Sequence, residues 1–308
     1  MIRLRNQMLP IITALLSSLL LVSMPGCSGR KTAFTYLPPK TRTRADAAAL
    51  KKQADEAWQR RDKTPSAEEA LDKYEAAYEA NPSDTAVAVQ RAQANFFMAE
   101  YVMAVKNAKP KAREEYFERG LAAGERALEL HAGFREVNRN TRDEEKALQE
   151  LDQAWVPAIF WTFANMVRWY EMQNPLRQLG NNLRLEVYRK RLRMLNDEFY
   201  YGGVYRLSGI IGQGDAEEVR FENAYEKALY LAPDFFSNYR VYAEKYALPK
   251  KNYALADSLL KSVVNGDPKG VPENMYEQEI AANLQKKEQS KLAQETTEKP
   301  KREFKPRY

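Results

Sequence analysis

The sequence has 308 residues, 44% of them hydrophobic and 29% charged, with only 13 glycines, a composition typical of one sizeable helical domain rather than a β-rich fold. A single cysteine and a single histidine exclude a disulfide framework and a zinc site, which needs about four Cys or His ligands. The net charge is +6, or +4 (46 − 42) without the two arginines of the leader described below, a mild and dispersed excess that argues against nucleic-acid binding.

Residues 1–26 are expected to form a signal peptide. Arg3 and Arg5 give it a positive start, and the apolar stretch from Pro10 to Val22 is shorter than the roughly 20 residues of a transmembrane helix. The tetrad Met24-Pro25-Gly26-Cys27 resembles the lipobox of bacterial lipoproteins, although its first two residues depart from the usual pattern. This resemblance implies that Cys27 is acylated. The alternative is an ordinary secretory signal with an incidental cysteine.

The residues after Cys27 bear on where the protein is anchored. Several acyl chains on one cysteine suffice for stable membrane attachment. In bacterial lipoproteins, Ser28 rather than aspartate at the next position favours sorting to the outer membrane, so we expect a location on the periplasmic face of the cell envelope. Residues 27–44 include two prolines and four threonines, which predicts a flexible tether.

Sequence signals for the starts and ends of helices recur over residues 45–285. Ser66 with Glu69 and Asp215 with Glu218 each fit a capping box at the start of a helix. Three segments share one template of a small or apolar residue, a large apolar residue, a smaller apolar residue and a proline: Ala70, Tyr74, Ala77 and Pro82; Phe221, Tyr225, Ala228 and Pro233; Ala256, Leu260, Val263 and Pro268.

The last two prolines of this template are 35 residues apart (268 − 233), close to the tetratricopeptide period of about 34. Small residues allow two antiparallel helices to approach, and the large residue fills the space between them. The sequence therefore predicts an all-α fold, a tetratricopeptide-like superhelix of helix pairs with irregular insertions, over residues 45–285. The charged segment 286–308 is expected to be a disordered tail.

The segment Ala154–Tyr170 interrupts the repeats and has one charged residue in seventeen. It contains Trp155, Trp161 and Trp169, three of the four tryptophans of the chain. A helix that is apolar on all sides is either buried in a core or faces an apolar cavity. Both interpretations are open, since aromatic side chains with a few polar groups also line small-molecule sites.

The next predicted helix, Arg184–Phe199, places Leu185, Tyr188, Leu192 and Leu195 on one apolar seam. The five basic residues of this helix lie off the seam. They form either a binding site for phosphate or an acidic partner, or a solvated face. After it, Phe199-Tyr200-Tyr201-Gly202-Gly203 predicts a tight loop or a close backbone approach. Gly209 is expected to permit close helix packing.

These motifs together resemble the TatT-type tetratricopeptide lipoproteins associated with TRAP transporters. The resemblance rests on the lipobox and on segments that together span most of residues 45–270: Ala158–Trp169, Phe199–Gly203, Val204–Ile211, Ala224–Asp234 and Tyr253–Pro268. The chain departs from the family in its turn Asn107-Ala108-Lys109-Pro110-Lys111 and in its long charged tail. The unusual turn is expected to affect partner docking.

The resemblance implies a lipid-anchored periplasmic accessory component of a TRAP-type transporter that forms a homotrimer. It also implies a hydrophobic pore or cavity in each protomer and pairing with a periplasmic solute-binding protein. We expect residues near the cavity, for a hydrophobic small-molecule ligand, to be Trp155, Trp161, Asn165, Trp169, Tyr200, Tyr201 and Arg206.

The two alternatives to this function are a generic scaffold and an enzyme. A generic tetratricopeptide scaffold of the cell envelope, serving outer-membrane protein assembly or secretion, fits the same repeats. An enzyme is disfavoured, because Glu217 and Glu218 fit the opening turn of a helix and the glycines from Gly209 to Gly214 lack the ending of a phosphate-binding loop. We therefore assign no catalytic, metal-binding or cofactor-binding residues.

Overall fold

The computed structural model describes residues 30–175, 178, 182–212 and 221–295, and over these ranges the chain forms helices and no strands, which confirms the all-α prediction. The α-helices are α2 Ala47–Gln59, α3 Thr64–Ala80, α4 Thr85–Phe97, α5 Met103–Val105, α6 Pro110–Leu128, α7 Ala132–Thr141, α8 Glu144–Gln149, α9 Val156–Glu171, α11 Asn182–Asn196, α12 Phe199–Ile211, α13 Phe221–Leu231, α14 Phe236–Tyr242, α15 Tyr253–Val264 and α16 Pro272–Glu295. Three short elements interrupt them: the π-helical turns η1 Met98–Val102 and η3 Ala243–Ala247, and the 3₁₀ turn η2 Gln153–Trp155.

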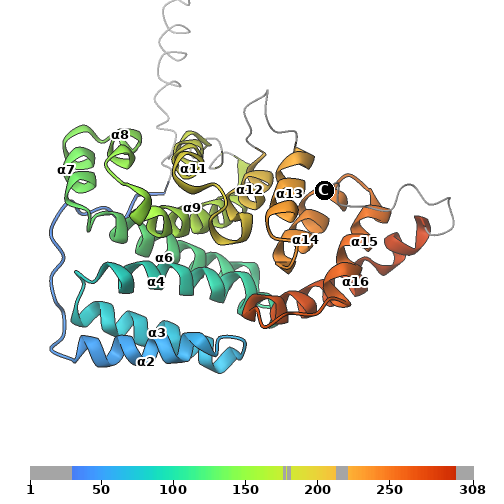
Figure 1. Ribbon diagram of the computed structural model, residues 1–308, viewed down its shortest axis with the longest axis horizontal. Coiled ribbons are helices and arrows are strands. Elements are labelled where there is room, and N and C mark those ends of the chain that lie inside the picture. The colour runs from blue at the N-terminus through green and yellow to red at the C-terminus, as the bar shows by residue number, and fades with distance from the viewer. Residues whose placement is uncertain (1–29, 176–177, 179–181, 213–220, 296–308) are drawn as a thin grey trace, which may run out of the picture.

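Consecutive helices pack on one another along the chain (Figure 1). Helix α2 packs on α3, α3 on α4, α4 on α6 and α6 on α9, and the series resumes with α12 on α13 and α15 on α16. Helix α16 also returns to contact η1 and α5, so the last helix touches the first half of the chain. Packing between neighbours is what a helical-pair repeat requires, while the superhelical tetratricopeptide arrangement stays a prediction.

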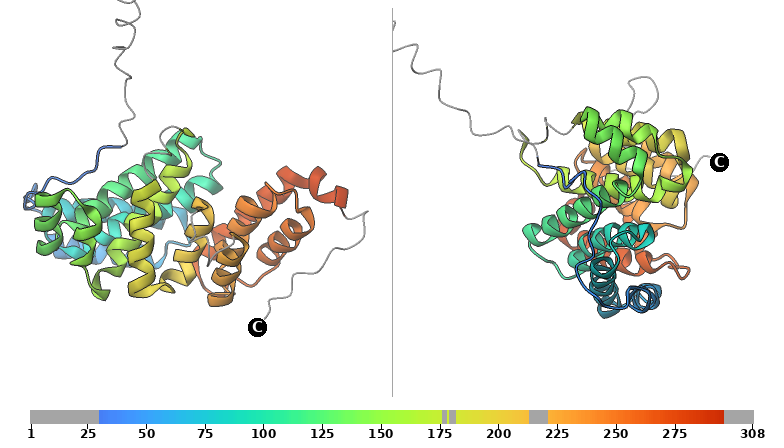
Figure 2. Two further views of the ribbon diagram at one scale, coloured as in Figure 1. Left: turned by 90° about the horizontal axis from the view of Figure 1, so that it is seen from above. Right: turned by 90° about the vertical axis from the view of Figure 1, so that its left-hand side faces the viewer.

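The buried apolar side chains form two separate groups. The larger group lies in α2–α12 and includes Tyr276 of α16, whereas the smaller lies in α13–α16. The left view of Figure 2 shows the same division, with α13–α16 projecting from the end of a thicker N-terminal bundle. The junction between the two groups is the region in which the polar side chains described below gather.

The repeat template predicts the packing residues correctly within the described ranges. Ala70, Tyr74 and Ala77 of α3 are buried, as are the remaining template residues of α13 and α15: Tyr225, Ala228, Ala256, Leu260 and Val263. At Gly209 a Cβ atom would lie 2.5 Å from the Tyr225 ring, so the predicted close approach is confirmed. The side chain of Phe221 and the Asp215–Glu218 box lie outside the described residues.

The predicted capping box at Ser66 and Glu69 is wrong. Helix α3 begins at Thr64, and Lys63 occupies the N-cap position without a side-chain hydrogen bond. Pro65 falls in the first turn, where its fixed φ is preorganised for a helix and its missing N–H costs nothing. The helix therefore starts three residues earlier than the box indicates, with its N-cap at Lys63 instead of Ser66.

Residues 286–295, which the sequence assigns to a disordered tail, continue α16. Lysine, glutamine and glutamate are good helix formers, and Leu292 of this segment is buried against the C-terminal core. The composition that suggests disorder is also the composition of an exposed helix. The chain beyond residue 295, like the signal peptide and Cys27, lies outside the described residues.

The first described residues, which the sequence assigns to a flexible tether, lie against α6. Arg30 pairs with Glu125 at 2.8 Å, and the side chain of Glu125 is fully buried. The backbone N–H of Ala33 donates to the same carboxylate at 2.7 Å, and that of Tyr36 donates to Glu129 at 2.6 Å. Two carboxylates, one on α6 and one at its C-cap, thus fix a segment whose composition alone predicts flexibility.

Candidate functional site

Helix α12 is interrupted near its start by a left-handed turn. Tyr200, Tyr201 and Gly202 have φ values of 52°, 58° and 66°. A left-handed conformation costs an L-residue roughly 1–2 kcal/mol, so two adjacent tyrosines here are held by their surroundings. Such strained positions cluster at binding and switch regions. The Tyr-Tyr-Gly-Gly motif is therefore the tight turn that the sequence predicts.

Tyr200 is held by contacts on both sides of the junction. Its ring lies edge-on to Trp161 of α9 with ring centroids 4.6 Å apart. Its hydroxyl donates to Glu273 of α16 at 2.9 Å, and this buried carboxylate also pairs with Arg61 at 3.1 Å. Burial and the neighbouring Glu273 raise the pKa of Tyr200 well above its ordinary value. The phenol is therefore a permanent hydrogen-bond donor.

Tyr201, unlike Tyr200, is exposed to solvent. Its side chain is 43% exposed, and its ring stacks on Phe235 with centroids 4.3 Å apart and an angle of 10°. A Cβ atom at Gly202 would lie 3.2 Å from the Ala228 Cα atom of α13. The turn thus joins α12 to the C-terminal helices and presents one aromatic ring to solvent.

Arg206, about one turn of α12 further on, is buried beside the same ring. Its guanidinium donates to Asn238 Oδ1 at 2.6 Å and lies 5.0 Å from the Phe235 ring centroid. Burial lowers its pKa. Phe235 was not among the residues expected here, because it follows a helix-ending proline in the sequence and no periodic pattern includes it.

The remaining predicted cavity residues lie elsewhere on α9 or, in the case of Trp155, in η2 directly before it. Asn165 is fully buried and donates from Nδ2 to the carbonyl oxygens of Ala92, at 3.0 Å, and Trp161, at 2.7 Å, which links α4 to α9. Trp169 is buried, and its indole N–H has no acceptor among the described residues. Trp155 packs on His131 with ring centroids 5.1 Å apart, at the other end of α9 from Trp169.

The structure thus brings Trp161, Tyr200, Tyr201 and Arg206 together and leaves Trp155 apart. Helix α9 is buried along nearly its whole length. Two cavities among the described residues are lined by other side chains. One, of about 570 Å³, lies beside α2 and is lined by charged residues that include Lys51 and Asp55. The hydrophobic cavity stays a prediction.

Two of the five basic side chains of α11 belong neither to a solvated face nor to an anion site, whereas Lys190 is exposed. Arg184 pairs with Glu125 and Glu144 at 2.7 and 2.8 Å. Arg189 is buried and pairs with Glu186 at 2.6 Å, one turn away. The guanidinium groups neutralise carboxylates of this chain and support the helix packing.

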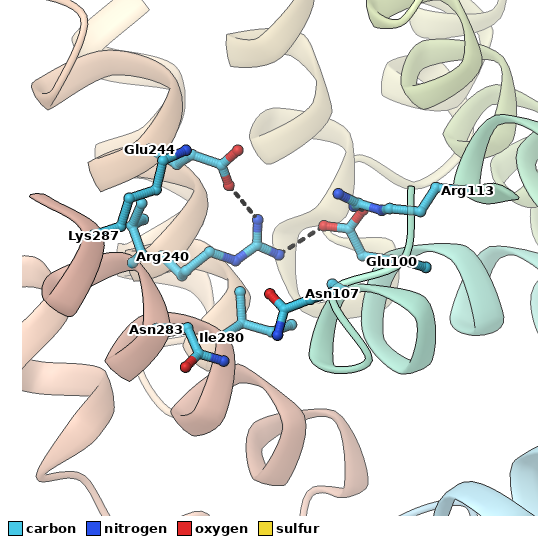
Figure 3. Close-up of a pocket in the computed structure, with 11 residues that line it drawn as sticks. Glu100, Asn107, Arg113, Arg240, Glu244, Ile280, Asn283 and Lys287 are labelled. Atoms are coloured by element: carbon cyan, nitrogen blue, oxygen red, sulfur yellow. Dashed lines mark hydrogen bonds and ion pairs between the residues drawn. The ribbon is translucent and has the colours of Figure 1, made fainter. Parts of the chain in front are cut away.

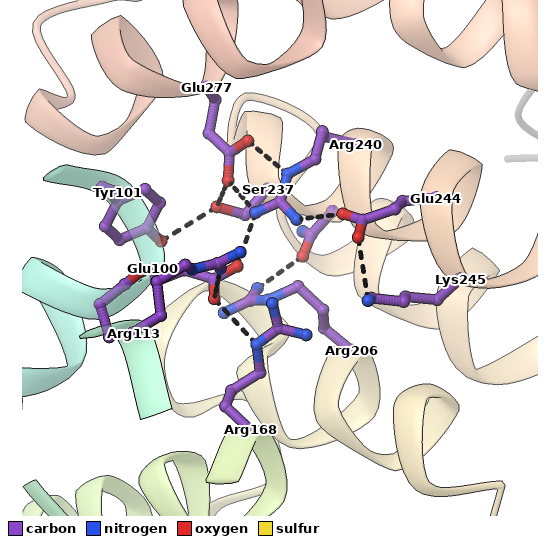
Figure 4. Close-up of polar contacts among 12 residues, drawn as sticks. Glu100, Tyr101, Arg113, Arg168, Arg206, Ser237, Arg240, Glu244, Lys245 and Glu277 are labelled. Carbon is purple, nitrogen blue, oxygen red and sulfur yellow. Dashed lines mark hydrogen bonds and ion pairs between the residues drawn. The ribbon is translucent and has the colours of Figure 1, made fainter. Parts of the chain in front are cut away.

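A network of buried charges lies between the two apolar cores (Figure 4). At its centre Glu100 of η1 accepts from Arg240 of α14 at 2.6 Å and from Arg168 of α9 at 2.8 Å, while Arg113 of α6 lies 3.6 Å away. Arg240 also pairs with Glu277 of α16 at 2.7 Å. No short-range pattern predicts these pairs, because Glu100 and Arg240 are 140 residues apart.

The network extends toward solvent through η3. Glu244 accepts from Arg240 at 2.8 Å and from Lys245 at 2.9 Å, and Lys245 also pairs with Glu171 of α9. Burial alone would raise the pKa of Glu100, but Arg168, Arg240 and Arg113 lower it to about 2. Lys245 and Arg240 likewise hold the pKa of Glu244 far below its ordinary value, against the opposite effect of burial.

A polar cavity of about 290 Å³ opens beside this network (Figure 3). Figure 3 shows Arg113 and Glu100 on one side, Glu244 and Lys287 on the other, and Arg240 between them. The complete lining is Glu100, Ala104, Asn107, Ala108, Arg113, Arg240, Glu244, Ile280, Asn283, Leu284 and Lys287. The cavity therefore lies between the η1–α5–α6 region and the C-terminal helices α14–α16.

The comparisons with known proteins give one finding. A protein-family model described as TRAP transporter T-component matches residues 70–296. The matched span includes the Tyr200–Gly202 turn, the Glu100 network and the polar cavity. A search of curated proteins gives no match.

The depressed pKa of Glu100 predicts that the free energy of unfolding decreases in acid. The ordinary pKa of this carboxyl is 4.5 and the folded-state value is about 2, so its stabilising contribution is complete above about pH 4.5 and is lost as pH falls toward 2. We expect the urea midpoint to fall over this range. Glu100→Gln should destabilise the protein by about 3–5 kcal/mol at pH 7, because three arginines lose their shared partner, and should flatten the pH dependence.

The exposed Glu68, which pairs with Lys106 at the surface, provides the matched control. Glu68→Gln should cost at most about 1 kcal/mol. Equal stabilities of the Glu100→Gln and Glu68→Gln variants at pH 7 would contradict a central role for Glu100.

Proposed function

Because the chain belongs to the TRAP transporter T-component family, whose model matches residues 70–296, we propose that it is a lipid-anchored, non-enzymatic component that binds a hydrophobic ligand and docks a periplasmic solute-binding protein. Membership itself gives the accessory role in a TRAP transporter and the location in the cell envelope. The family match is the observation that carries the proposal. It favours this role over a generic envelope scaffold, which the repeats alone would equally fit.

The proposed anchor is Cys27, three residues before Arg30. A chain spans at most about 3.6 Å per residue, so acyl chains on Cys27 would hold the docked segment on α6 within about 10 Å of the lipid. Arg30 and its partner Glu125 would then set the orientation of the body at the membrane surface. Within the described ranges, no helix has both the length and the apolar character needed to cross a membrane.

The proposed ligand site is the aromatic group around the left-handed turn. Trp161, Tyr200 and Phe235 provide apolar surface, and burial of such surface contributes roughly 25 cal/mol per Å². The Tyr200 hydroxyl, whose hydrogen is donated to Glu273, offers an acceptor oxygen, and the buried Arg206, which donates to Asn238, has further N–H groups. Strain at Tyr200 and Tyr201 supports this assignment, since strained backbone is retained where the surrounding structure uses it.

The proposed docking surface is centred on Tyr201. Exposed tyrosines are enriched among the residues that contribute most to binding at protein interfaces, and Tyr201 is both exposed and fixed by its stacking on Phe235. A partner that covered this ring would lie beside the aromatic group. A homotrimer, which the family resemblance implies, completes the proposal.

Mass spectrometry of the protein purified from its native envelope tests the anchor and the ligand separately. We expect the denatured chain to begin at Cys27 and to carry covalent acyl chains, visible also as incorporation of labelled palmitate. Under native conditions an additional apolar ligand should remain bound without a covalent link. Cys27→Ser should lose the covalent mass and keep the non-covalent one. An unmodified mature chain, or a native mass without ligand, would refute the corresponding half.

Crosslinking in the native envelope tests the partner. We expect capture of the solute-binding protein of the same transporter, and a Tyr201→Ala variant should bind that purified protein about tenfold more weakly. Tyr116→Ala provides a matched control, because Tyr116 is a partly exposed tyrosine on α6 that contacts Arg119, and its affinity should equal that of the wild type. Capture of outer-membrane assembly factors without a solute-binding protein would support the scaffold instead.

A further inference from the structure

Helix α11 is apolar on two opposite sides, and only one of them is covered. Leu185, Tyr188 and Leu192 are buried in the N-terminal core. The other side carries Leu183, which is 77% exposed, and Met194, which is 76% exposed. A helix with about 3.6 residues per turn brings positions 183 and 194 to the same side, about 16 Å apart along its axis. The second apolar side of α11 therefore faces solvent.

The exposed apolar side chains of the described residues are unevenly placed. Single exposed apolar side chains are ordinary on protein surfaces, but here the three largest exposed fractions belong to Leu183, Met194 and Leu37. Two of these residues are on α11, and Leu37 directly follows Tyr36 of the N-terminal segment that docks on α6. Apolar exposure is thus greatest in α11 and in the segment that follows the proposed anchor.

The N-terminal segment meets the body beside the first turn of α11. Glu125 accepts from Arg30 at 2.8 Å and from Arg184 at 2.7 Å, so one buried carboxylate joins this segment to α11. Leu183 is the neighbour of Arg184 in the chain. Cys27 is three residues before Arg30, a span of at most about 10 Å. Acyl chains on Cys27 would therefore enter the lipid close to the start of α11.

The charges on the exposed side of α11 suit an anionic lipid surface. Glu186 is the only acidic residue of the helix, and Arg189 pairs with it at 2.6 Å. Lys190 lies 3.8 Å from this already paired carboxylate and keeps 57% of its side chain in solvent, between Leu183 and Met194. A lysine beside apolar side chains can extend its ammonium group to lipid phosphates while its carbon chain stays against the apolar surface.

Helix α11 also lies at an edge of the molecule. Figure 1 shows α7, α8 and α11 along one edge and α2 and α3 along the opposite edge, and the right view of Figure 2 agrees. A flat surface laid against the edge formed by α11 would therefore leave α2 and α3 farthest from it.

We propose that the exposed side of α11 rests on the membrane, with Leu183 and Met194 inserted at the boundary between headgroups and acyl chains and Lys190 against lipid phosphates. The inference rests on the proposed anchor at Cys27, which brings the helix to the lipid. Amphipathic helices bind membranes in this way, parallel to the surface. An anchor at one point leaves the body free to rotate, whereas a second contact along α11 fixes its orientation.

Fluorescence on vesicles tests this contact without native acylation. The mature chain would carry Cys27→Ser and an N-terminal histidine tag, held by a nickel-chelating lipid in vesicles of phosphatidylethanolamine and phosphatidylglycerol. Because Cys27 is the only cysteine, Leu183→Cys or Met194→Cys then supplies a single thiol for a nitrobenzoxadiazole label. We expect the emission of either label to shift to shorter wavelength on the vesicles and to be quenched by spin-labelled lipid, because the label leaves water.

Met275→Cys, labelled in the same way, provides the matched control. Met275 is an exposed methionine of α16, and the hydroxyl of the adjacent Tyr276 donates to the carbonyl oxygen of Arg61, between α2 and α3. This position is therefore on the side of the molecule away from α11. Its label should have the same emission with and without vesicles.

The proposal is overturned if the labels at Leu183 and Met194 respond to vesicles no more than the label at Met275. It is also overturned if both labels are already shielded from water without vesicles, in a manner that depends on protein concentration, since α11 would then contact another copy of the chain. The histidine tag replaces the acyl chains, so a failure of this contact can be told apart from a failure of the anchor, which mass spectrometry detects.

Discussion

The buried carboxylate of Glu100 is shared by arginines from three helices. Arg168 of α9 and Arg113 of α6 belong to the N-terminal bundle, whereas Arg240 of α14 belongs to the C-terminal helices. Removing one partner of a buried ion pair costs about 3–5 kcal/mol, a large part of the 5–15 kcal/mol that stabilises a typical domain. Since the apolar cores of the two halves are separate, their relative position depends strongly on this contact.

The left-handed turn at Tyr200 forms a second connection between the halves. Its phenol reaches Glu273 at the start of α16, and Tyr201 stacks on Phe235 just before α14. The aromatic group and the polar cavity therefore both lie at the same junction, one beside each connection. Both features therefore lie where they bear on how α13–α16 sit against the bundle.

The sequence predicts those features that depend on local periodicity. The template residues of α3, α13 and α15 are buried as expected, the Tyr-Tyr-Gly-Gly motif is a tight turn, and Gly209 permits the approach of Tyr225. Local signals mislead where a distant partner decides the outcome. The segment from Arg30 has the composition of a tether but is fixed by carboxylates more than ninety residues away.

Dependence on distant partners also explains why the sequence analysis did not identify the charged residues of the candidate site. Glu100 lies in an ordinary-looking helical segment, and its partners are 68 and 140 residues away. Arg240 and Glu277 likewise lie in no motif. Buried ion pairs between distant helices leave no periodic signal, whereas aromatic side chains gathered in one segment, such as those of α9, are visible in a single sequence.

Hydrogen–deuterium exchange of an Arg240→Met variant tests most directly whether the ion-pair network holds the two halves together. The substitution replaces the guanidinium group by an apolar side chain of similar length, removes the ion-pair partner of Glu277 and leaves Glu100 with Arg168 and Arg113 of the N-terminal bundle alone. If the network has this role, backbone amides of α13–α16 should exchange faster than in the wild type while those of α2–α4 keep their protection. Unchanged protection in α13–α16, or an equal loss throughout the chain, would contradict it.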